Sequence, residues 1–283
     1  MKNLFVFAPL IFARRFVHQA TGTIDWLAIG QTTLVFGMFC LTSGAVYLLN
    51  DIVDRDKDRL HPTKRLRPIP SGRLSVPTAT IVSVSSAIVA LTVGLLWEPL
   101  LAGVLTAYLT LNVAYSFILK HIVFADVISI ATGFLLRILG GAIAITVPVT
   151  VWLYACTFLL ASFLGLGKRK HEILLSHKSA HAQRRVLRSY RLHWVNRAMV
   201  VLGIATAVCY TAYTVSEHAV HQFGSRAMVF TVPFIVVGLF RFVGLLNRSQ
   251  VADSPTDAML KDRWFLTNLA AWVVVVLWIV YRA

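Results

Sequence analysis

Residues 26–50 read WLAIGQTTLVFGMFCLTSGAVYLLN, and residues 51–58 continue as DIVDRDKD. The first stretch is long enough to cross a membrane as a helix, because about 20 apolar residues span a hydrocarbon core of about 30 Å. The second stretch places four acids within eight residues at the end of that helix. An apolar span that ends in a dense acidic cluster predicts a membrane protein with a polar site at one membrane face.

The whole chain shares this apolar character. Of its 283 residues, 57% are hydrophobic and 14% are charged, and the mean hydropathy is +0.72. Soluble domains carry about 25% charged residues, so the composition excludes an ordinary soluble protein. Lys and Arg total 27 against 12 Asp and Glu, a net charge of +15. In an apolar chain this surplus indicates membrane asymmetry or a polyanionic ligand rather than nucleic acid.

Apolar runs recur along the chain, and we expect nine membrane-spanning helices. Helices are expected because backbone groups in lipid must be satisfied internally, and the runs lack the alternation of barrel strands. No linker divides the chain, so we expect one domain over residues 1–283. The predicted fold class is an all-α integral membrane protein. Its expected spans are 3–20, 26–50, 74–97, 99–119, 122–146, 150–167, 196–216, 226–246 and 264–281.

Cations concentrate in the loops that follow the second, sixth and eighth expected spans. Short cytoplasmic loops of membrane proteins hold an excess of Lys and Arg. We therefore expect a multi-pass protein of the inner (plasma) membrane, with its N-terminus and these loops in the cytoplasm and its C-terminus outside.

The acids after the second span have helical spacing. Asp51, Asp54 and Asp58 share one face if the helix continues past the membrane, and Asn50 lies one turn before Asp54. Crowded carboxylates repel one another, and Mg²⁺, which prefers oxygen ligands, is commonly held by one or two carboxylates plus substrate phosphates. The alternative is a solvated helix end whose acids pair with the neighbouring cations Arg55, Lys57 and Arg59.

Residues 61–72, HPTKRLRPIPSG, bring cations directly after the acids on a segment stiffened by three prolines. Lys64 and Arg67 therefore lie where a metal-bound diphosphate needs positive charge. The combined pattern, NDxxDxxxD at 50–58 followed by HPxKxxRP at 61–68, resembles the first aspartate-rich motif of the UbiA prenyltransferase superfamily. The resemblance implies a nine-helix bundle with a cytoplasmic polar cavity that binds diphosphates through Mg²⁺.

The loop after the sixth span departs from the prenyl-diphosphate pattern. Aromatic-acceptor members of the superfamily have a second acidic motif there, whereas this chain has Lys168, Arg169 and Lys170, followed by Glu172. Consecutive cations favour bare phosphate oxygens, which Lys and Arg contact directly. Taken alone, these cations would also serve as a topological anchor.

Three further patterns resemble the decaprenyl-phosphate phosphoribosyltransferase subfamily: YSFxLK at 115–120, DV at 126–127 with GFxLR at 133–137, and KRxxE at 168–172. Relatives usually carry an Arg-Pro-x-x-Trp stretch before the Lys-Asn pair seen here at 2–3, and both an incorrect start and a genuine loss of that arm are open. The resemblance implies transfer of 5-phosphoribose from phosphoribosyl diphosphate (PRPP) to a polyprenyl phosphate, in arabinose-donor and cell-wall glycan synthesis.

The implied site has four groups of residues. Asn50, Asp51, Asp54 and Asp58 hold Mg²⁺ on the leaving diphosphate, and Lys64 and Arg67 contact that diphosphate. The ribose 5-phosphate or the lipid phosphate meets Lys168, Arg169 and Lys170, with Glu172 in the same motif. The floor is formed by Tyr115, Lys120, Asp126 and Arg137. Which cation meets which phosphate is open at this point, as is the oligomeric state.

Arg137 is the most informative single residue, because it lies near the middle of an apolar span. A charge there costs at least about 2.5 kcal/mol, so a partner or an aqueous cavity is expected. Asp126 lies three turns earlier on the same face, about 16 Å away along the axis. The alternatives are an arginine capped by carbonyls or paired with an acid of another helix. Lys120, at the membrane boundary, could instead simply snorkel.

Two other functions compete with phosphoribosyl transfer. An aromatic prenyltransferase that uses a polyprenyl diphosphate is disfavoured by the missing second acidic motif. A transporter or lipid-binding membrane protein is disfavoured because the charges cluster in the cytoplasmic loops rather than in broken helices at the membrane midplane.

Overall fold

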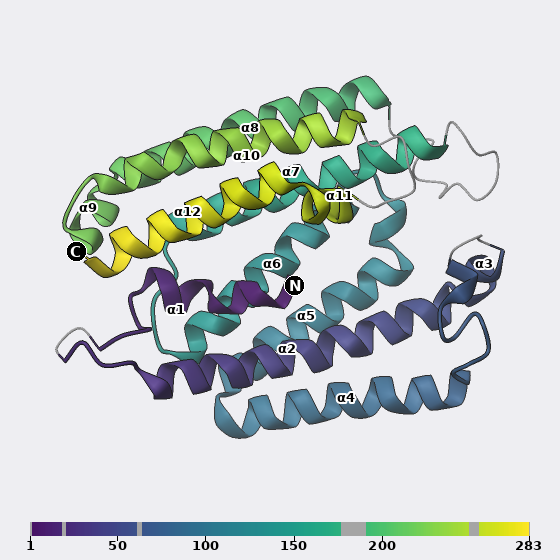
Figure 1. Cartoon of the computed structure of the whole chain (residues 1–283). Coiled ribbons are helices and arrows are strands. Elements are labelled where there is room, and N and C mark those ends of the chain that lie inside the picture. The colour runs from purple at the N-terminus through teal and green to yellow at the C-terminus, as the bar shows by residue number, and fades with distance from the viewer. Residues whose placement is uncertain (1, 19–20, 61–63, 177–190, 249–254, 283) are drawn as a thin grey trace. The chain divides into compact units, whose positions relative to one another are not determined.

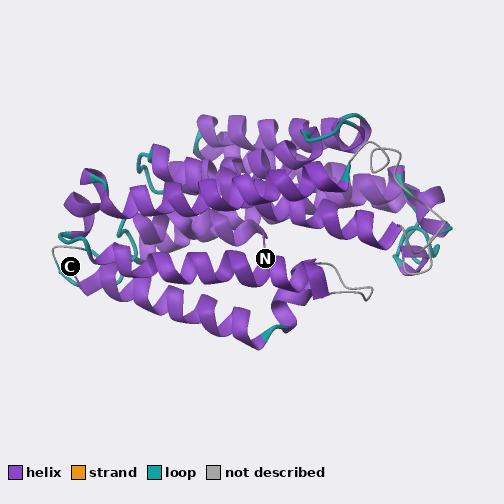
Figure 2. Ribbon diagram, turned by 90° about the horizontal axis from the view of Figure 1, so that it is seen from above, coloured by secondary structure: helices purple, strands orange, loops and turns teal. Residues whose placement is uncertain are grey.

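The computed structural model describes residues 2–18, 21–60, 64–176, 191–248 and 255–282. Every regular element in these residues is a helix, and the only strand-like pairing among them is an isolated bridge between Val17 and Ile24 (Figure 2). His61 and Pro62 of the motif lie outside the described residues. The all-α prediction is confirmed.

Contacts divide the chain into two compact units, residues 1–149 and 150–283 (Figure 1). The first unit contains η1 Lys2–Phe7, α1 Ala8–Phe12, α2 Trp26–Val53, α3 Arg55–Arg59, η2 Lys64–Leu66, α4 Val76–Trp97, α5 Pro99–Phe117, η3 Leu119–His121 and α6 Ala125–Ala144. The second contains α7 Val151–Ser176, α8 Leu192–Val215, α9 Glu217–Phe223, η5 Ala227–Thr231, α10 Val232–Arg248, α11 Pro255–Lys261 and α12 Arg263–Arg282.

Eight helices among the described residues are long and apolar enough to cross a membrane. They match the second to ninth expected spans, with ends shifted by a few residues. Their bounds are Trp26–Val53, Val76–Trp97, Pro99–Phe117, Ala125–Ala144, Val151–Leu174, Leu192–Val215, Ala227–Asn247 and Arg263–Arg282.

The first expected span, 3–20, is not a full span. Its helical part is the shorter apolar stretch Lys2–Phe12. The chain then leaves the helix at Arg14, whose φ of 56° is in the left-handed region that L residues rarely adopt. A ninth crossing is therefore not confirmed in the described part of the chain.

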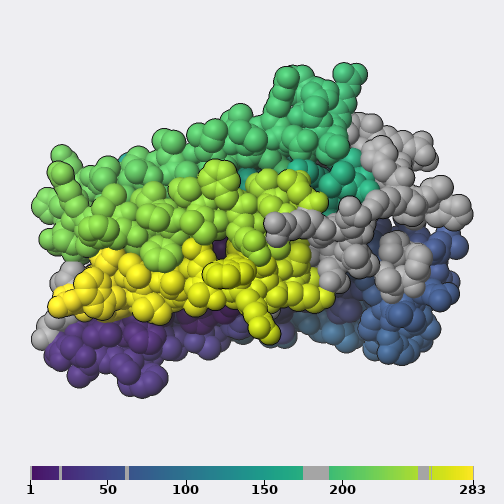
Figure 3. All heavy atoms as spheres, turned by 45° about the horizontal axis from the view of Figure 1, so that its top comes forward, coloured from purple at the N-terminus to yellow at the C-terminus, as the bar shows by residue number. Residues whose placement is uncertain are grey.

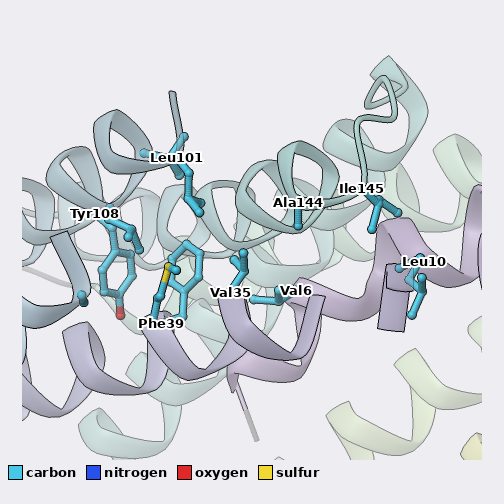
Figure 4. Packing of buried hydrophobic residues seen from close by; sticks show 13 residues of the cluster. Val6, Leu10, Val35, Phe39, Leu101, Tyr108, Ala144 and Ile145 are labelled. Carbon is cyan, nitrogen blue, oxygen red and sulfur yellow. The ribbon is translucent and has the colours of Figure 1, made fainter. Parts of the chain in front are cut away.

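The core of the first unit forms where η1 packs against α2 and α6 (Figure 4). Val6, Phe39 and Leu101 are fully buried there, and the ring of Phe39 meets that of Tyr108 edge to face at 5.4 Å. Gly141 makes this approach possible, because a Cβ at that position would lie 1.9 Å from the carbonyl oxygen of Val6. The N-terminal segment is thus an integral part of the bundle.

In the second unit, α7 packs along α8, and α10 contacts α7, α8 and α12. Gly167 of α7 allows the ring of Phe242 to approach so closely that a Cβ would lie 2.5 Å from it. Large apolar side chains such as Phe240 and Trp264 are exposed on α10 and α12, which Figure 3 shows in yellow-green and yellow. Apolar side chains on the outside of a membrane-spanning helix are expected, because they face lipid rather than water.

Candidate functional site

The acidic end of α2 is interrupted at Asp54, where two hydrogen bonds of helical spacing bridge the interruption. α2 ends at Val53 and α3 begins at Arg55. Across the interruption, the backbone N–H of Asp54 donates to the carbonyl of Asn50 at 2.9 Å, and that of Asp58 donates to the carbonyl of Asp54 at 2.8 Å. Asp54 therefore lies one turn after Asn50, and Asp58 one turn after Asp54, although the helix does not continue unbroken.

Arg67 joins two of these acids. Its Nη1 donates to Asp51 Oδ1 at 2.8 Å and to Asp58 Oδ2 at 2.9 Å. Lys64 Nζ lies 3.8 Å from the other oxygen of Asp58, which is buried. The two carboxylates thus converge on one cationic nitrogen. Asp51, Asp58, Lys64 and Arg67, all predicted site residues, come together here.

Two of the three cations named in the alternative interpretation have a different partner, and Lys57 forms no ion pair among the described residues. Arg55 and Arg59 pair with the exposed Asp56, at 3.1 Å and 3.7 Å. They form no ion pair with Asp51, Asp54 or Asp58 among the described residues. Asp51 and Asp58 are paired instead with Arg67 and Lys64, the cations of the next motif.

Asp54 pairs with Lys120. The Nζ of Lys120 lies 3.0 Å and 3.2 Å from the two carboxylate oxygens of Asp54. Lys120 belongs to η3, just after α5, and its residue is only 5% exposed. Lys120 therefore does not simply snorkel to the membrane surface, because it forms an ion pair with a residue 66 positions earlier in the chain.

Three other predicted residues of the first unit flank this region in the sequence. Asn50 and Tyr115 are half-buried near the ends of α2 and α5. Asp126 is fully buried in the first turn of α6, where its Oδ1 accepts from the N–H of Val127 at 2.8 Å. The residue before α6, Phe124, has a φ of 64°. Such strained backbone is common at functional sites.

Arg137 is 4% exposed within α6. Its Nε donates to Asn3 Oδ1 at 2.8 Å, its Nη1 to the carbonyl of Gly133 at 2.8 Å, and its Nη2 to Tyr108 Oη at 2.7 Å. All three acceptors are neutral. Among the alternatives, the carbonyl-capped arginine describes part of this arrangement, and a pair with an acid does not.

The basic stretch of the second unit, residues 168–172, lies in the last turns of α7. Lys168 is exposed, whereas Arg169 is fully buried and pairs with Glu172 one turn later. Lys170 is also buried, and its Nζ donates to Asn247 Oδ1 of α10 at 2.9 Å. With three cations and one acid, the stretch itself carries a net positive charge.

Asn3, Ser43, Tyr108 and Asn247 touch predicted site residues, or one another, but were not predicted. Each is a neutral polar residue inside a helix of apolar character. The only signal in the sequence is that a polar group buried in a bundle needs a hydrogen-bonding partner. That signal does not name the partner.

The oxygen donors of the first unit suit a hard divalent cation by chemistry. Among the described residues, however, no three His, Cys, Asp or Glu side chains gather as a ready metal cage. Cations of the chain itself occupy the acids: Arg67 is between Asp51 and Asp58, and Lys120 is on Asp54. A metal would have to exchange with these side chains.

The chain is similar in sequence to two named enzymes and in fold to a protein of solved structure. Decaprenyl-phosphate phosphoribosyltransferase of Mycobacterium tuberculosis is 29% identical over 248 residues, covering 88% of this chain and 81% of the relative. The enzyme of the same name from Corynebacterium glutamicum is 28% identical over 278 residues, covering 96% and 82%. A UbiA homolog from Archaeoglobus fulgidus, solved with DMAPP and Mg²⁺, has a TM-score of 0.69 at 16% identity and covers 99% of both chains.

The structural likeness to the Archaeoglobus protein extends over nearly the whole chain and concerns the fold. The sequence profile of the UbiA prenyltransferase family matches residues 6–269, from the N-terminal segment into the last helix. The chain is therefore a multi-pass membrane protein that belongs to the UbiA prenyltransferase family.

Proposed function

We propose that this protein transfers 5-phosphoribose from PRPP to a polyprenyl phosphate and releases diphosphate, in a reaction that depends on Mg²⁺. The observation that carries the proposal is the contrast between an acidic cluster, in which Asp51 and Asp58 converge on Arg67, and a basic stretch with one acid, Glu172. The names of the mycobacterial and corynebacterial relatives support the choice of substrates.

The oxygen donors of the acidic cluster are the kind of ligand that Mg²⁺ prefers. Asn50, Asp51, Asp54 and Asp58 are its proposed ligands, and the bound ion supplies neutralisation of charge on the leaving diphosphate. The Mg²⁺ bound to the Archaeoglobus protein supports a divalent metal in this fold. Arg67 and Lys64, released from the carboxylates, would then contact the diphosphate oxygens, since both side chains lie beside the acids.

The basic stretch is the proposed site for the remaining phosphate groups. Lys168 is exposed and able to meet a ligand, and Lys170 is held by Asn247. Glu172 fixes the buried guanidinium of Arg169. Tyr115, Lys120, Asp126 and Arg137 are the further proposed substrate-binding residues of the first unit.

The chemistry requires no strong general base. A phosphate monoester is already anionic at neutral pH, so one of its oxygens can attack the anomeric carbon as the bond from that carbon to the diphosphate oxygen breaks. Sugar transfer of this kind passes through an oxocarbenium-like state. The protein's part is to align the two phosphates and stabilise the departing charge. In-line attack inverts the anomeric carbon.

The direct test is an incubation of the purified protein with radiolabelled PRPP, Mg²⁺ and polyprenyl phosphate, followed by solvent extraction. A labelled lipid is expected, and it should be absent when polyprenyl phosphate is omitted. A parallel reaction with prenyl diphosphate and 4-hydroxybenzoate separates the aromatic prenyltransferase alternative. Product only in that parallel reaction would overturn the proposal.

The setting of the enzyme is also part of the proposal. We place the chain in the inner membrane as a single functional domain, with its N-terminus and the acidic and basic clusters in the cytoplasm and its C-terminus outside. Its product would serve arabinose-donor and cell-wall glycan synthesis, and no nucleic acid takes part. Reporter fusions at the two ends test the orientation, because opposite sides are expected.

A further inference from the structure

Among the described residues, Arg137 is a buried cation that has only neutral partners, as is Lys170, whose Nζ donates to Asn247. Lys120 is paired with Asp54 and Arg169 with Glu172, but Arg137 forms no ion pair with any described residue. Its guanidinium instead lies 4.7 Å from the ring centre of Tyr108 and 5.5 Å from that of Phe134. Aromatic rings stabilise a cation without neutralising it. The guanidinium of Arg137 is therefore stabilised by neutral groups and has no carboxylate counter-charge among the described residues.

Four side chains from four elements form a closed ring of hydrogen bonds around this charge. Arg137 of α6 donates to Asn3 of η1 and to Tyr108 of α5. Ser43 of α2 completes the ring, because its Oγ lies 3.2 Å from Asn3 Oδ1 and 3.1 Å from Tyr108 Oη. Asn3 is fixed from its other end too, since its Nδ2 donates to Cys40 Sγ at 3.3 Å.

The polarity of the ring is determined by the donors. An arginine has five N–H groups and no acceptor, so Asn3 Oδ1 and Tyr108 Oη must accept from it. Ser43 has one proton, which it donates to Asn3, so the hydroxyl of Tyr108 donates to Ser43. Every oxygen that contacts the guanidinium thus presents its negative end, and no net charge is introduced.

The ring leaves Arg137 with unused binding capacity. Three of its five N–H groups have acceptors, namely Asn3, Gly133 and Tyr108. The other two, one on each Nη, have none among the described residues. A planar guanidinium with an N–H free on each terminal nitrogen suits the oxygens of a phosphate.

We propose that Asn3, Ser43 and Tyr108 are positioning residues that hold the uncompensated guanidinium of Arg137 as a contact for a phosphate group of the substrates. This inference rests on the proposed function for the identity of the phosphate compounds. Asn3 is the central member, because its side-chain amide touches three partners and comes from the N-terminal segment.

The decisive variant is Asn3→Asp, which keeps an acceptor oxygen beside Nε but adds a negative charge. A purely structural ring would tolerate this change or gain from it, because a buried cation acquires a counter-charge. If the ring instead preserves the positive charge for a ligand, the Asn3→Asp protein should be stable but should bind phosphate compounds more weakly. Asn268→Asp is the matched control: Asn268 of α12 donates Nδ2 to the carbonyl of Phe234 and forms no hydrogen bond with a cation among the described residues.

The measurement is thermal stabilisation of the full chain in detergent by inorganic diphosphate, PRPP and polyprenyl phosphate, each titrated separately. We expect Asn3→Asp to melt at or above the wild-type temperature and to bind at least one of these compounds about tenfold more weakly, the loss of one charged hydrogen bond. Asn268→Asp should melt lower and keep wild-type affinity. Tyr108→Phe, which removes one acceptor without adding charge, should weaken the same binding by a smaller factor.

The inference is overturned if both Asn3→Asp and Tyr108→Phe bind all three compounds as the wild type does, or if no compound stabilises the wild type. If Asn3→Asp does not fold, Tyr108→Phe decides. Failure of the proposed function looks different: the wild type would bind a phosphate compound, and Asn3→Asp would weaken that binding, but no labelled lipid would form from PRPP.

Discussion

The acidic end of α2 and the basic end of α7 differ in the charge that their own residues carry and in the partners that the structure gives them. Each of the three predicted metal-binding acids has a cation from the first unit, either Arg67 or Lys120. The basic stretch has three cations and one acid, Glu172, which pairs with Arg169. A ligand at the acidic end must therefore displace existing partners, whereas the basic stretch holds two more cations than acids within its own sequence.

The largest expected effect follows from removing the proposed metal site at the acidic end. Asp54→Asn, or EDTA with wild-type protein, should reduce phosphoribosyl transfer to the detection limit, because the leaving diphosphate would lose its counter-charge. Asp56→Asn is the control, since Asp56 is exposed and pairs with Arg55 and Arg59 outside the cluster. It should retain wild-type turnover. Full turnover in EDTA would refute the metal role.

Arg137 lies in the same unit as the three paired acids but forms no ion pair among the described residues. Arg137→Met should lower turnover about 100-fold or more, since two charged hydrogen bonds to a ligand contribute about 1.5–3 kcal/mol each. The melting temperature should stay within a few degrees of wild type, because no carboxylate is stranded. A loss of about 3–5 kcal/mol in the free energy of unfolding would instead reveal an ion-pair partner.

The basic stretch offers a matched pair of variants. Lys168→Ala should weaken use of PRPP or lipid phosphate about tenfold or more at unchanged stability, because the side chain is exposed and one charged hydrogen bond is lost. Arg169→Ala should show a similar kinetic loss together with a lower melting temperature, because Arg169 is buried against Glu172. Unchanged kinetics for both variants would leave this stretch as a topological anchor.

Substitution of Lys64 has the smallest expected effect, and it tests whether this side chain contacts the diphosphate. Its Nζ is 3.8 Å from Asp58 and the side chain is partly exposed. Lys64→Ala should change the free energy of unfolding by less than about 1 kcal/mol. A several-fold increase in the KM for PRPP is expected if Lys64 contacts the diphosphate. An unchanged KM would assign the diphosphate to Arg67 alone.

Local pattern predicted the fold class, and it predicted that Asp51 and Asp58 lie on one side of the helix end. Eight of the nine expected spans correspond to helices of spanning length, because a run of apolar residues is a local property. Asp51 and Asp58 share a partner as the helical spacing required. The first expected span was longer than its helix because a hydropathy pattern does not show that Arg14 takes a left-handed backbone.

Partners from distant segments could not be predicted. Lys120 pairs with Asp54 across 66 residues, and Arg137 meets Asn3 across 134. Periodicity places a side chain on a face of its own helix but says nothing about which helix lies opposite. The sequence predicted that Arg137 needs a partner, whereas only the packing of η1 against α6 identified that partner as an amide.

The close packing of η1 against α6 also affects the order in which the bundle assembles. Residues 2–7 leave the ribosome well before α5 and α6, yet Gly141 and Arg137 of α6 provide the surface and the hydrogen bond that receive them. This segment therefore cannot take its final place until α6 has been synthesised and inserted, on the order of a hundred residues later. The start of the chain joins the bundle late in assembly.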